Sequence, residues 1–124
     1  MCHQTVSLVA RHLEENGMPT VIIGSARDIV EHCGVARFLF VDFPLGNPCG
    51  KPWDRPMQRR IVSQGLGLFD SAATAGTTLV SAERWDDDEW KHRYMEVSDA
   101  NRAELAQKGE ELRRRRQQRQ PREE

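Results

Sequence analysis

This chain of 124 residues has no long apolar run, no excess of one charge and few cysteines. No segment approaches the roughly 20 apolar residues that cross a bilayer, and no signal-peptide pattern opens the sequence. The formal net charge of −1 gives no general attraction to nucleic acid or to an anionic membrane. We therefore expect a cytoplasmic protein that binds neither membranes nor nucleic acid.

The cysteines are Cys2, Cys33 and Cys49, and no two of them form a Cys-x-x-Cys pair. Their odd number and spacing argue against a disulfide scaffold and against a structural zinc site. We expect no metal ion and no cofactor bound by this chain. In a reducing cytosol the three thiols stay free unless one of them performs chemistry. Cys33 lies near the end of a predicted helix, where we expect it to be buried as a small hydrophobe.

Charged residues make up 30% of the chain and are concentrated in its second half. This imbalance predicts an α/β domain at residues 1–72, a linker at residues 73–85 and a charged helical or disordered tail at residues 86–124. The tail contains a cluster of arginines at positions 113–116 and 119. Glutamates flank the cluster and no aromatic residue interrupts it, so we interpret it as a solvated tail rather than a nucleic-acid contact.

The first forty residues alternate between helix and strand patterns. The apolar residues Val6, Val9, Ala10 and Leu13 recur at helical spacing between Gln4 and Asn16, which predicts a helix with these residues on its inner face. The wholly apolar runs Val21–Ile23 and Phe38–Val41 are typical of strands buried on both faces. Between them, Ser25 to Asp28 has the pattern of a capping box that opens a short helix.

A further helix follows the second strand. Asp54 is expected to cap it, and its predicted inner face consists of Met57, Ile61, Leu68 and Phe69. Thr78 to Val80 has the composition of a further short strand. This order of elements predicts an α/β fold with a partial parallel sheet and flanking helices, a three-layer, Rossmann-like fragment that carries a charged C-terminal helix or tail.

Cys2 is the first candidate for chemistry because it stands at the predicted start of the first helix. Backbone N–H groups in a first helical turn carry partial positive charge and favour a thiolate over a thiol. Thr5 lies one turn further on, so its hydroxyl faces the same side of the helix. The other interpretation is an incidental terminal cysteine. We interpret the neighbouring His3 as a surface residue.

The second candidate is the loop from Pro44 to Pro52, which contains three prolines and two glycines. A stiff loop that leaves the C-terminal end of a parallel strand lies where open α/β sheets bind ligands. We expect substrate contacts from four residues of this loop: Gly46, Asn47, Cys49 and Lys51. Lys51, Trp53 and Asp54 also offer a clamp for a small zwitterion. The slightly favoured alternative packs Trp53 onto the core, with Asp54 as the helix cap.

Three segments together resemble a known enzyme family: Cys2-His3-Gln4-Thr5, Leu13-Glu14-x-x-Gly17-x-Pro19 and Phe43-Pro44-Leu45-Gly46-Asn47-Pro48. They resemble the C-terminal part of the B components of the glycine, sarcosine and betaine reductases, and of the related D-proline reductase. In that family a selenocysteine or cysteine is followed three residues later by a second cysteine, and a helix then ends in Gly-x-Pro. The resemblance covers roughly residues 2 to 70 and places Cys2 at the second cysteine.

The resemblance implies an oxidoreductase that cleaves a C–N bond reductively, with electrons from dithiols. A selenol or thiolate attacks the small amino-acid-like substrate, and Cys2 is then the resolving thiol beside it, with Thr5 where many members have a further cysteine. Partner reductase subunits are also implied. The selenocysteine position would fall three residues before Cys2, outside this sequence. We expect that a UGA codon was misread as a stop, and that the chain as given lacks the leading strand and the full reaction.

A second hypothesis needs no catalysis. The chain would then be an α/β module that binds a small ligand or acts as an accessory subunit, with Lys51, Trp53 and Asp54 making the contact. The two hypotheses differ in the reactivity that they require of Cys2.

Overall fold

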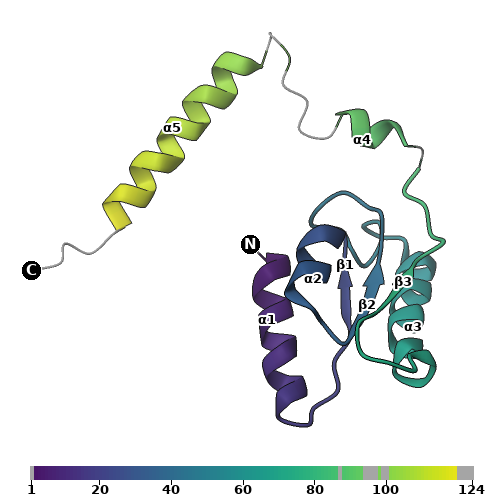
Figure 1. Ribbon diagram of the computed structural model, residues 1–124. Helices are drawn as coiled ribbons and strands as arrows, with labels where there is room; N and C mark the ends of the chain where they lie inside the picture. The colour runs from purple at the N-terminus through teal and green to yellow at the C-terminus, as the bar shows by residue number, and fades with distance from the viewer. Residues whose placement is uncertain (1, 87, 94–97, 99–100, 120–124) are drawn as a thin grey trace, which may run out of the picture. The chain divides into compact units, whose positions relative to one another are not determined.

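The computed structural model describes residues 2–86, 88–93, 98 and 101–119. The chain forms two compact units, Met1–Lys91 and His92–Glu124. The first unit contains three helices and three strands in alternation: α1 (Cys2–Glu15), β1 (Ile22–Gly24), α2 (Arg27–Cys33), β2 (Arg37–Phe40), α3 (Arg55–Ser71) and β3 (Thr77–Val80) (Figure 1). The short helix α4 (Glu89–Arg93) follows, and α5 (Arg102–Arg119) belongs to the second unit.

The three strands form a parallel sheet in the order β1-β2-β3. Ile22 pairs with Phe38 across β1 and β2, and Leu39 pairs with Leu79 across β2 and β3. The predicted α/β fold with a parallel sheet, flanking helices and a C-terminal helix is thus confirmed. β3 lies within residues 73–85, which the composition assigned to a linker, and its pairing with β2 makes this segment part of the sheet.

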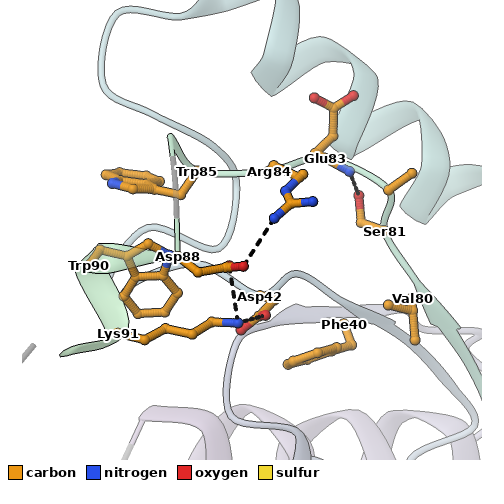
Figure 2. Close-up of a pocket in the computed structure, with 11 residues that line it drawn as sticks. Phe40, Asp42, Val80, Ser81, Glu83, Arg84, Trp85, Asp88, Trp90 and Lys91 are labelled. Atoms are coloured by element: carbon orange, nitrogen blue, oxygen red, sulfur yellow. Dashed lines mark hydrogen bonds and ion pairs between the residues drawn. The ribbon is translucent and has the colours of Figure 1, made fainter.

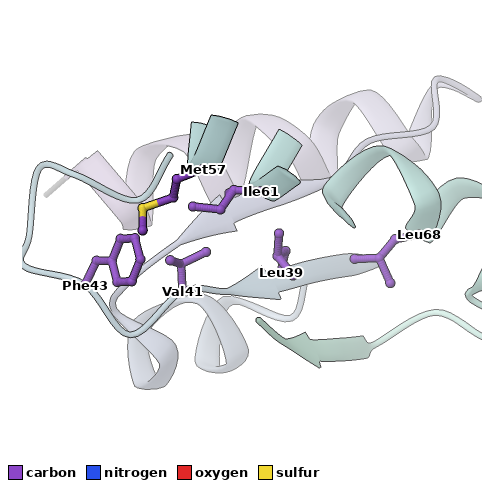
Figure 3. Packing of buried hydrophobic residues seen from close by; sticks show 6 residues of the cluster. All are labelled: Leu39, Val41, Phe43, Met57, Ile61 and Leu68. Carbon is purple, nitrogen blue, oxygen red and sulfur yellow. The ribbon is translucent and has the colours of Figure 1, made fainter. Parts of the chain in front are cut away.

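The sheet separates two apolar clusters because successive side chains of a strand point to opposite faces. On one face α1 and α2 cover Ile22 and Phe38, with Ala10, Val30 and Val35 buried beside them. On the other face α3 covers the second cluster, whose buried members are Leu39, Val41, Phe43, Met57, Ile61 and Leu68 (Figure 3). The three-layer arrangement follows from these two clusters.

The predicted inner face of α1 is confirmed for Ala10, which is buried, and wrong for Val6 and Val9, which are 45% and 51% exposed. Ser7 is buried in their place. The Ser7 hydroxyl donates a hydrogen bond of 2.6 Å to the carbonyl of His3 within the same helix. Small side chains let the helix lie close to the sheet, so the apolar stripe of the sequence lies on a flank of α1 and not beneath it.

Two other local predictions are also wrong. Phe69 of α3 is 39% exposed, and its ring packs under the guanidinium of Arg37, 5.5 Å away, instead of entering the core. The capping box at Ser25 does not form, because Ala26 is the N-cap of α2 and no side chain caps this helix. Asp54 does cap α3, since its carboxylate accepts a hydrogen bond from the Met57 N–H at 3.0 Å.

Glu14 connects the end of α1 to the start of the sheet. Its Oε1 accepts hydrogen bonds from the Thr20 N–H at 2.6 Å and from Arg37 Nη1 at 2.8 Å. The bond from the Thr20 N–H, together with the charge of Arg37, lowers the pKa of Glu14. This carboxylate therefore holds α1, the turn before β1 and the first residue of β2 together.

The second unit is described through its helix α5. Ion pairs at i, i+4 spacing line this helix, with 2.6 Å between Lys108 and Glu104 and 2.6 Å between Arg115 and Glu111. Leu105 and Leu112 are 44% and 56% exposed, so within the described residues α5 buries little apolar surface. The tail after Arg119 lies outside the described residues. Among the helices that the structure describes, none has the length and apolar character to cross a membrane.

Candidate functional site

Three helices begin at the edge where the parallel strands end. α2 starts directly after β1, and α3 starts after the loop that follows β2. α1 runs in the opposite direction to the strands, so its first turn lies at this same edge (Figure 1). Ligands of open α/β sheets bind at the carboxyl ends of the strands. The candidate residues of the sequence fall along this edge, in two separate groups.

The first group contains Cys2 and Thr5. Cys2 is the first residue of α1, and its thiol is free and exposed to solvent. Thr5 lies one helical turn further on and is also exposed. The structure thus places Cys2 at the first position of α1 and Thr5 one turn further on, as the sequence predicted. Their catalytic role stays a prediction.

His3 fixes this first turn of α1 against the sheet. Its Nε2 accepts a hydrogen bond of 3.1 Å from the backbone N–H of Ser25, the residue that follows β1. The imidazole lies on Gly24, where an added Cβ would approach its Cδ2 to 3.0 Å. His3 is half-buried and is not the surface residue that we expected. The glycine that ends β1 is the one sequence signal for this contact, because it makes room for the ring.

The second group is the loop after β2. Gly46 adopts a φ of +95°, which favours glycine, and the Asn47 N–H donates to the Pro44 carbonyl at 3.1 Å. The Gly50 N–H in turn donates to the Asn47 carbonyl at 3.2 Å, so two successive turns fold the loop. The Cys49 thiol is free and exposed. The loop is thus held by its own backbone.

Lys51 and Asp54 do not form the clamp that the sequence suggested. The Lys51 ammonium pairs with the Asp86 carboxylate and lies 5.7 Å from the centre of the Trp85 ring. Asp54 is engaged as the cap of α3. Trp53 between them is 95% exposed and has a φ of +69°, so the slightly favoured packing of Trp53 onto the core is wrong.

A cavity of about 380 Å³ lies at the C-terminal ends of β2 and β3 (Figure 2). The indoles of Trp85 and Trp90 form part of its lining, together with the ring of Phe40. Charged groups of both signs complete the lining: Asp42, Glu83, Arg84, Asp88 and Lys91. A cavity of this composition can bind a small zwitterion, because it offers cations for a carboxylate and carboxylates for an ammonium group.

Ion pairs organise the charges of this cavity. Lys91 Nζ lies 2.5 Å from Asp42 Oδ2 and 3.5 Å from Asp88 Oδ1 (Figure 2). The hydrogen bond to Asp42 raises the pKa of Lys91. Arg84 Nη2 lies 3.0 Å from Asp88 Oδ2. Because Lys91 and Asp42 come from distant parts of the chain, their pair also holds the segment after β3 against the end of β2.

Glu83 is paired outside this network. The Arg60 guanidinium on α3 makes two hydrogen bonds to its carboxylate, at 2.7 and 3.0 Å. The bond from Arg60 lowers the pKa of Glu83.

Sequence reasoning missed the cavity because it assigned residues 80–91 to a linker and a tail. The signal that it passed over is the alternation of tryptophans with charges at Arg84-Trp85-Asp86 and Glu89-Trp90-Lys91.

The loop after β2 reaches the cavity, because the Lys51 ammonium lies 5.7 Å from the centre of the Trp85 ring, but Cys2 and Thr5 are separate from both. Cys2 lies beside β1, whereas the cavity lies between the ends of β2 and β3. The loop is tied to α3, since Gln58 Nε2 donates to the Lys51 carbonyl at 2.6 Å. Across the described ranges, no group of three or more histidine, cysteine, aspartate or glutamate side chains is placed to hold a metal ion.

The chain is similar to part of a D-proline reductase subunit. It is 32% identical over 75 residues to the D-proline reductase subunit gamma of Acetoanaerobium sticklandii. The match covers 60% of this chain but 31% of the relative, so the chain spans about a third of that protein's length. No family model and no solved structure matches the sequence. The similarity supports the resemblance to D-proline reductase. It does not extend to the glycine, sarcosine and betaine reductases.

Proposed function

We propose that this chain carries the resolving thiol of a reductase related to D-proline reductase, which cleaves a C–N bond of a small amino-acid-like substrate reductively. The observation that carries the proposal is the exposed Cys2 thiol at the first turn of α1, on the ligand-binding edge of the sheet. The partial similarity to the gamma subunit supports a related reductase-like function.

Cys2 has a specific role in this proposal. In the family that the chain resembles, a selenol supplies the nucleophile for the C–N bond. The selenol would displace the nitrogen from the substrate carbon and form a Se–C bond. The Cys2 thiolate would then attack selenium, so that a Se–S bond forms as the Se–C bond breaks and the carbon takes up a proton. An external dithiol reduces the Se–S bond and restores both groups. Thr5, one turn further along α1, faces the same side of the helix and would bound this site. Companion subunits would complete it, as the name of the relative implies for that protein.

The substrate would bind at the ends of β2 and β3. Its carboxylate would pair with Lys91 or Arg84, and its ammonium group with Asp42, inside the cavity that Trp85 and Trp90 help to line. The loop residues that we expect to contact substrate, Gly46, Asn47, Cys49 and Lys51, remain part of the proposal. The backbone turns of the loop support this part of the proposal. They already hold Asn47 and Cys49 in place, so the loop needs no further ordering to bind a substrate.

Thiol alkylation tests the role of Cys2. The chain is treated with iodoacetamide at several pH values, and the rate at each cysteine is followed by peptide mass spectrometry. Cys49 is the matched control because its thiol is also exposed and lies in a loop, away from any helix start. We expect Cys2 to react at least five times faster than Cys49 at pH 7. Equal rates for the two thiols would remove the support for a redox role.

Two further results address the family assignment. An in-frame UGA or cysteine codon three positions before Cys2 in the DNA would supply the expected nucleophile, and an unrelated codon would contradict it. A protein that includes this codon should cleave the C–N bond of D-proline or glycine reductively when dithiothreitol and companion subunits are present. Cys2→Ser should then arrest the reaction after a single turnover, since the oxidised nucleophile is no longer resolved.

A second function has support in the cavity itself. A non-catalytic module would bind a small zwitterion in the cavity that Trp85 and Trp90 help to line, without using Cys2. Calorimetric titration with D-proline and with glycine separates the two proposals. Binding that is lost in Lys91→Met and kept in Cys2→Ser, in a chain whose thiols react at equal rates, would favour the module.

A further inference from the structure

The cavity at the ends of β2 and β3 contains a row of alternating charges (Figure 2). Lys91 Nζ lies 2.5 Å from Asp42 Oδ2 and 3.5 Å from Asp88 Oδ1. The other oxygen of Asp88 lies 3.0 Å from Arg84 Nη2. Two carboxylates therefore face two cations, and these four side chains together carry no net charge.

The remaining charge of the described lining does not change this balance. Glu83 also lines the cavity, but the Arg60 guanidinium on α3 neutralises its carboxylate through two hydrogen bonds. The balance persists at neutral pH, because the hydrogen bond to Asp42 raises the pKa of Lys91 and keeps its ammonium group protonated. A ligand of this cavity thus enters a set of charges that are already matched.

A matched set of charges discriminates between ligands by the charges that they carry. A simple carboxylate that approaches the Lys91 ammonium also meets Asp42 and Asp88, since both carboxylates lie against the same nitrogen. Their repulsion offsets the attraction of the ammonium group. A zwitterion avoids this conflict, because its carboxylate can contact Lys91 while its own ammonium group contacts Asp42.

The pair of Lys91 and Asp42 has the capacity for both contacts. An ammonium group has three donors, and the contacts of Lys91 with Asp42 and Asp88 account for two of them. Asp42 is paired through Oδ2, and its other oxygen can accept a hydrogen bond from a ligand. The aromatic part of the lining offers an apolar surface to the rest of the ligand and strengthens the electrostatic selection by excluding water.

We infer that Asp42 is the specificity-determining residue of this cavity, because it makes the cavity accept a zwitterion and reject a ligand that has the carboxylate alone. The inference rests on the proposed function, which places the substrate here. With Asp42 neutral, the four side chains would carry a net positive charge and attract simple carboxylates. With Lys91 neutral, they would carry a net negative charge and attract simple cations. The two substitutions should thus shift the selectivity in opposite directions.

Three ligands with the same five-membered ring test this inference. D-Proline carries both charges, cyclopentanecarboxylate lacks the ammonium group and pyrrolidine lacks the carboxylate. Each is titrated into the isotope-labelled full chain at pH 7, and the indole N–H resonances of Trp85 and Trp90 report binding. Trp53 is the internal control, because it is 95% exposed and does not line the cavity. We expect D-proline to bind at least tenfold more tightly than either analogue, with the Trp53 resonance unchanged.

Two substitutions should change this preference in opposite ways. Asp42→Asn should bind cyclopentanecarboxylate at least as tightly as D-proline, and several times more tightly than the unaltered chain does. Lys91→Met should bind pyrrolidine more tightly and D-proline less tightly than before. Asp70→Asn is the matched control, because it makes the same change of net charge at an exposed carboxylate of α3 that does not line the cavity. It should leave all three affinities unchanged.

Four results would each overturn the selection by Asp42. The first is equal affinity of the unaltered chain for D-proline and cyclopentanecarboxylate, and the second is no binding of any of the three ligands. The third is the same change in Asp42→Asn as in Asp70→Asn. The fourth is a loss of all three ligands in both Asp42→Asn and Lys91→Met, since the ion pair would then shape the cavity without selecting its ligand.

The outcomes for this selection and for the redox role of Cys2 are distinguishable. A fast-reacting Cys2, in a chain that does not discriminate between D-proline and cyclopentanecarboxylate, keeps the redox role and removes the selection. A preference for D-proline that Asp42→Asn reverses, in a chain whose Cys2 reacts no faster than Cys49, keeps the selection and removes the redox role.

Discussion

Replacing His3 by alanine removes the hydrogen bond that holds the first turn of α1 to the end of β1. Nε2 of His3 accepts from the Ser25 N–H at 3.1 Å, and the ring covers Gly24. Because this imidazole is half-buried beneath the helix, water cannot fully replace it. The substitution therefore tests whether this contact positions Cys2, which precedes His3 directly.

Two contributions determine how much His3→Ala lowers the free energy of unfolding. Leaving a part-buried N–H without its acceptor costs about 1–3 kcal/mol. Removing about half of a buried ring adds roughly 1 kcal/mol of lost apolar burial. We therefore expect His3→Ala to lower the free energy of unfolding by about 2–4 kcal/mol. A domain of this size shifts its melting temperature by about 4–8 °C per kcal/mol, so the expected drop is at least about 8 °C.

Urea unfolding followed by tryptophan fluorescence measures this change, with the thiol alkylation rate of Cys2 recorded on the same protein. His12→Ala is the matched control, because His12 lies on the same helix and its side chain is exposed. The control should change the free energy of unfolding by less than about 0.5 kcal/mol. If His3→Ala proves no more destabilising than His12→Ala, the anchoring role assigned to His3 is wrong.

Two further substitutions test other parts of the structure. The Thr20 N–H and Arg37 lower the pKa of Glu14 below its ordinary value near 4.5, so its stabilising effect is present above that pH and is lost as the pH falls through the lowered pKa. Glu14→Gln should flatten the acid decline of the urea midpoint, and an unchanged slope would contradict this. Trp53→Gly should raise the free energy of unfolding by about 0.5–1 kcal/mol, because relief of left-handed strain exceeds the added entropy of the unfolded chain. Trp53→Ala, which keeps a Cβ, should leave the free energy unchanged, and a loss in both variants would mean that Trp53 makes contacts.

The fold was predictable because its signals are local. The runs Val21–Ile23 and Phe38–Val41 are short, wholly apolar and rich in β-branched and aromatic residues, a pattern typical of strands covered on both faces. Asp54, followed by Pro56, specifies a helix start, because its carboxylate accepts a hydrogen bond from the backbone N–H three residues later. Each of these signals is complete within a few residues of sequence.

The wrong predictions concern properties that depend on distant neighbours. Periodicity identified an apolar stripe on α1, but which flank of the helix approaches the sheet depends on size, and Ser7 and Ala10 are the small residues. Ser25 has the sequence of a helix cap, yet its N–H is used by His3, which lies 22 positions earlier. The charged cavity joins Asp42 to Lys91, which lie 49 positions apart. No short window of sequence contains such pairs.

The spacing of the sheet limits what Cys2 can do. β1 and β3 are separated by two strand spacings, which amounts to about 10 Å. A substrate held in the cavity at the ends of β2 and β3 is therefore further from Cys2 than a cysteine side chain can reach. Direct attack by Cys2 on such a substrate is therefore not the role that we propose. A resolving thiol has no need to touch the substrate, because it reacts with the oxidised nucleophile instead. In the proposed function this spacing supports the resolving role of Cys2, and the nucleophile would lie between Cys2 and the cavity.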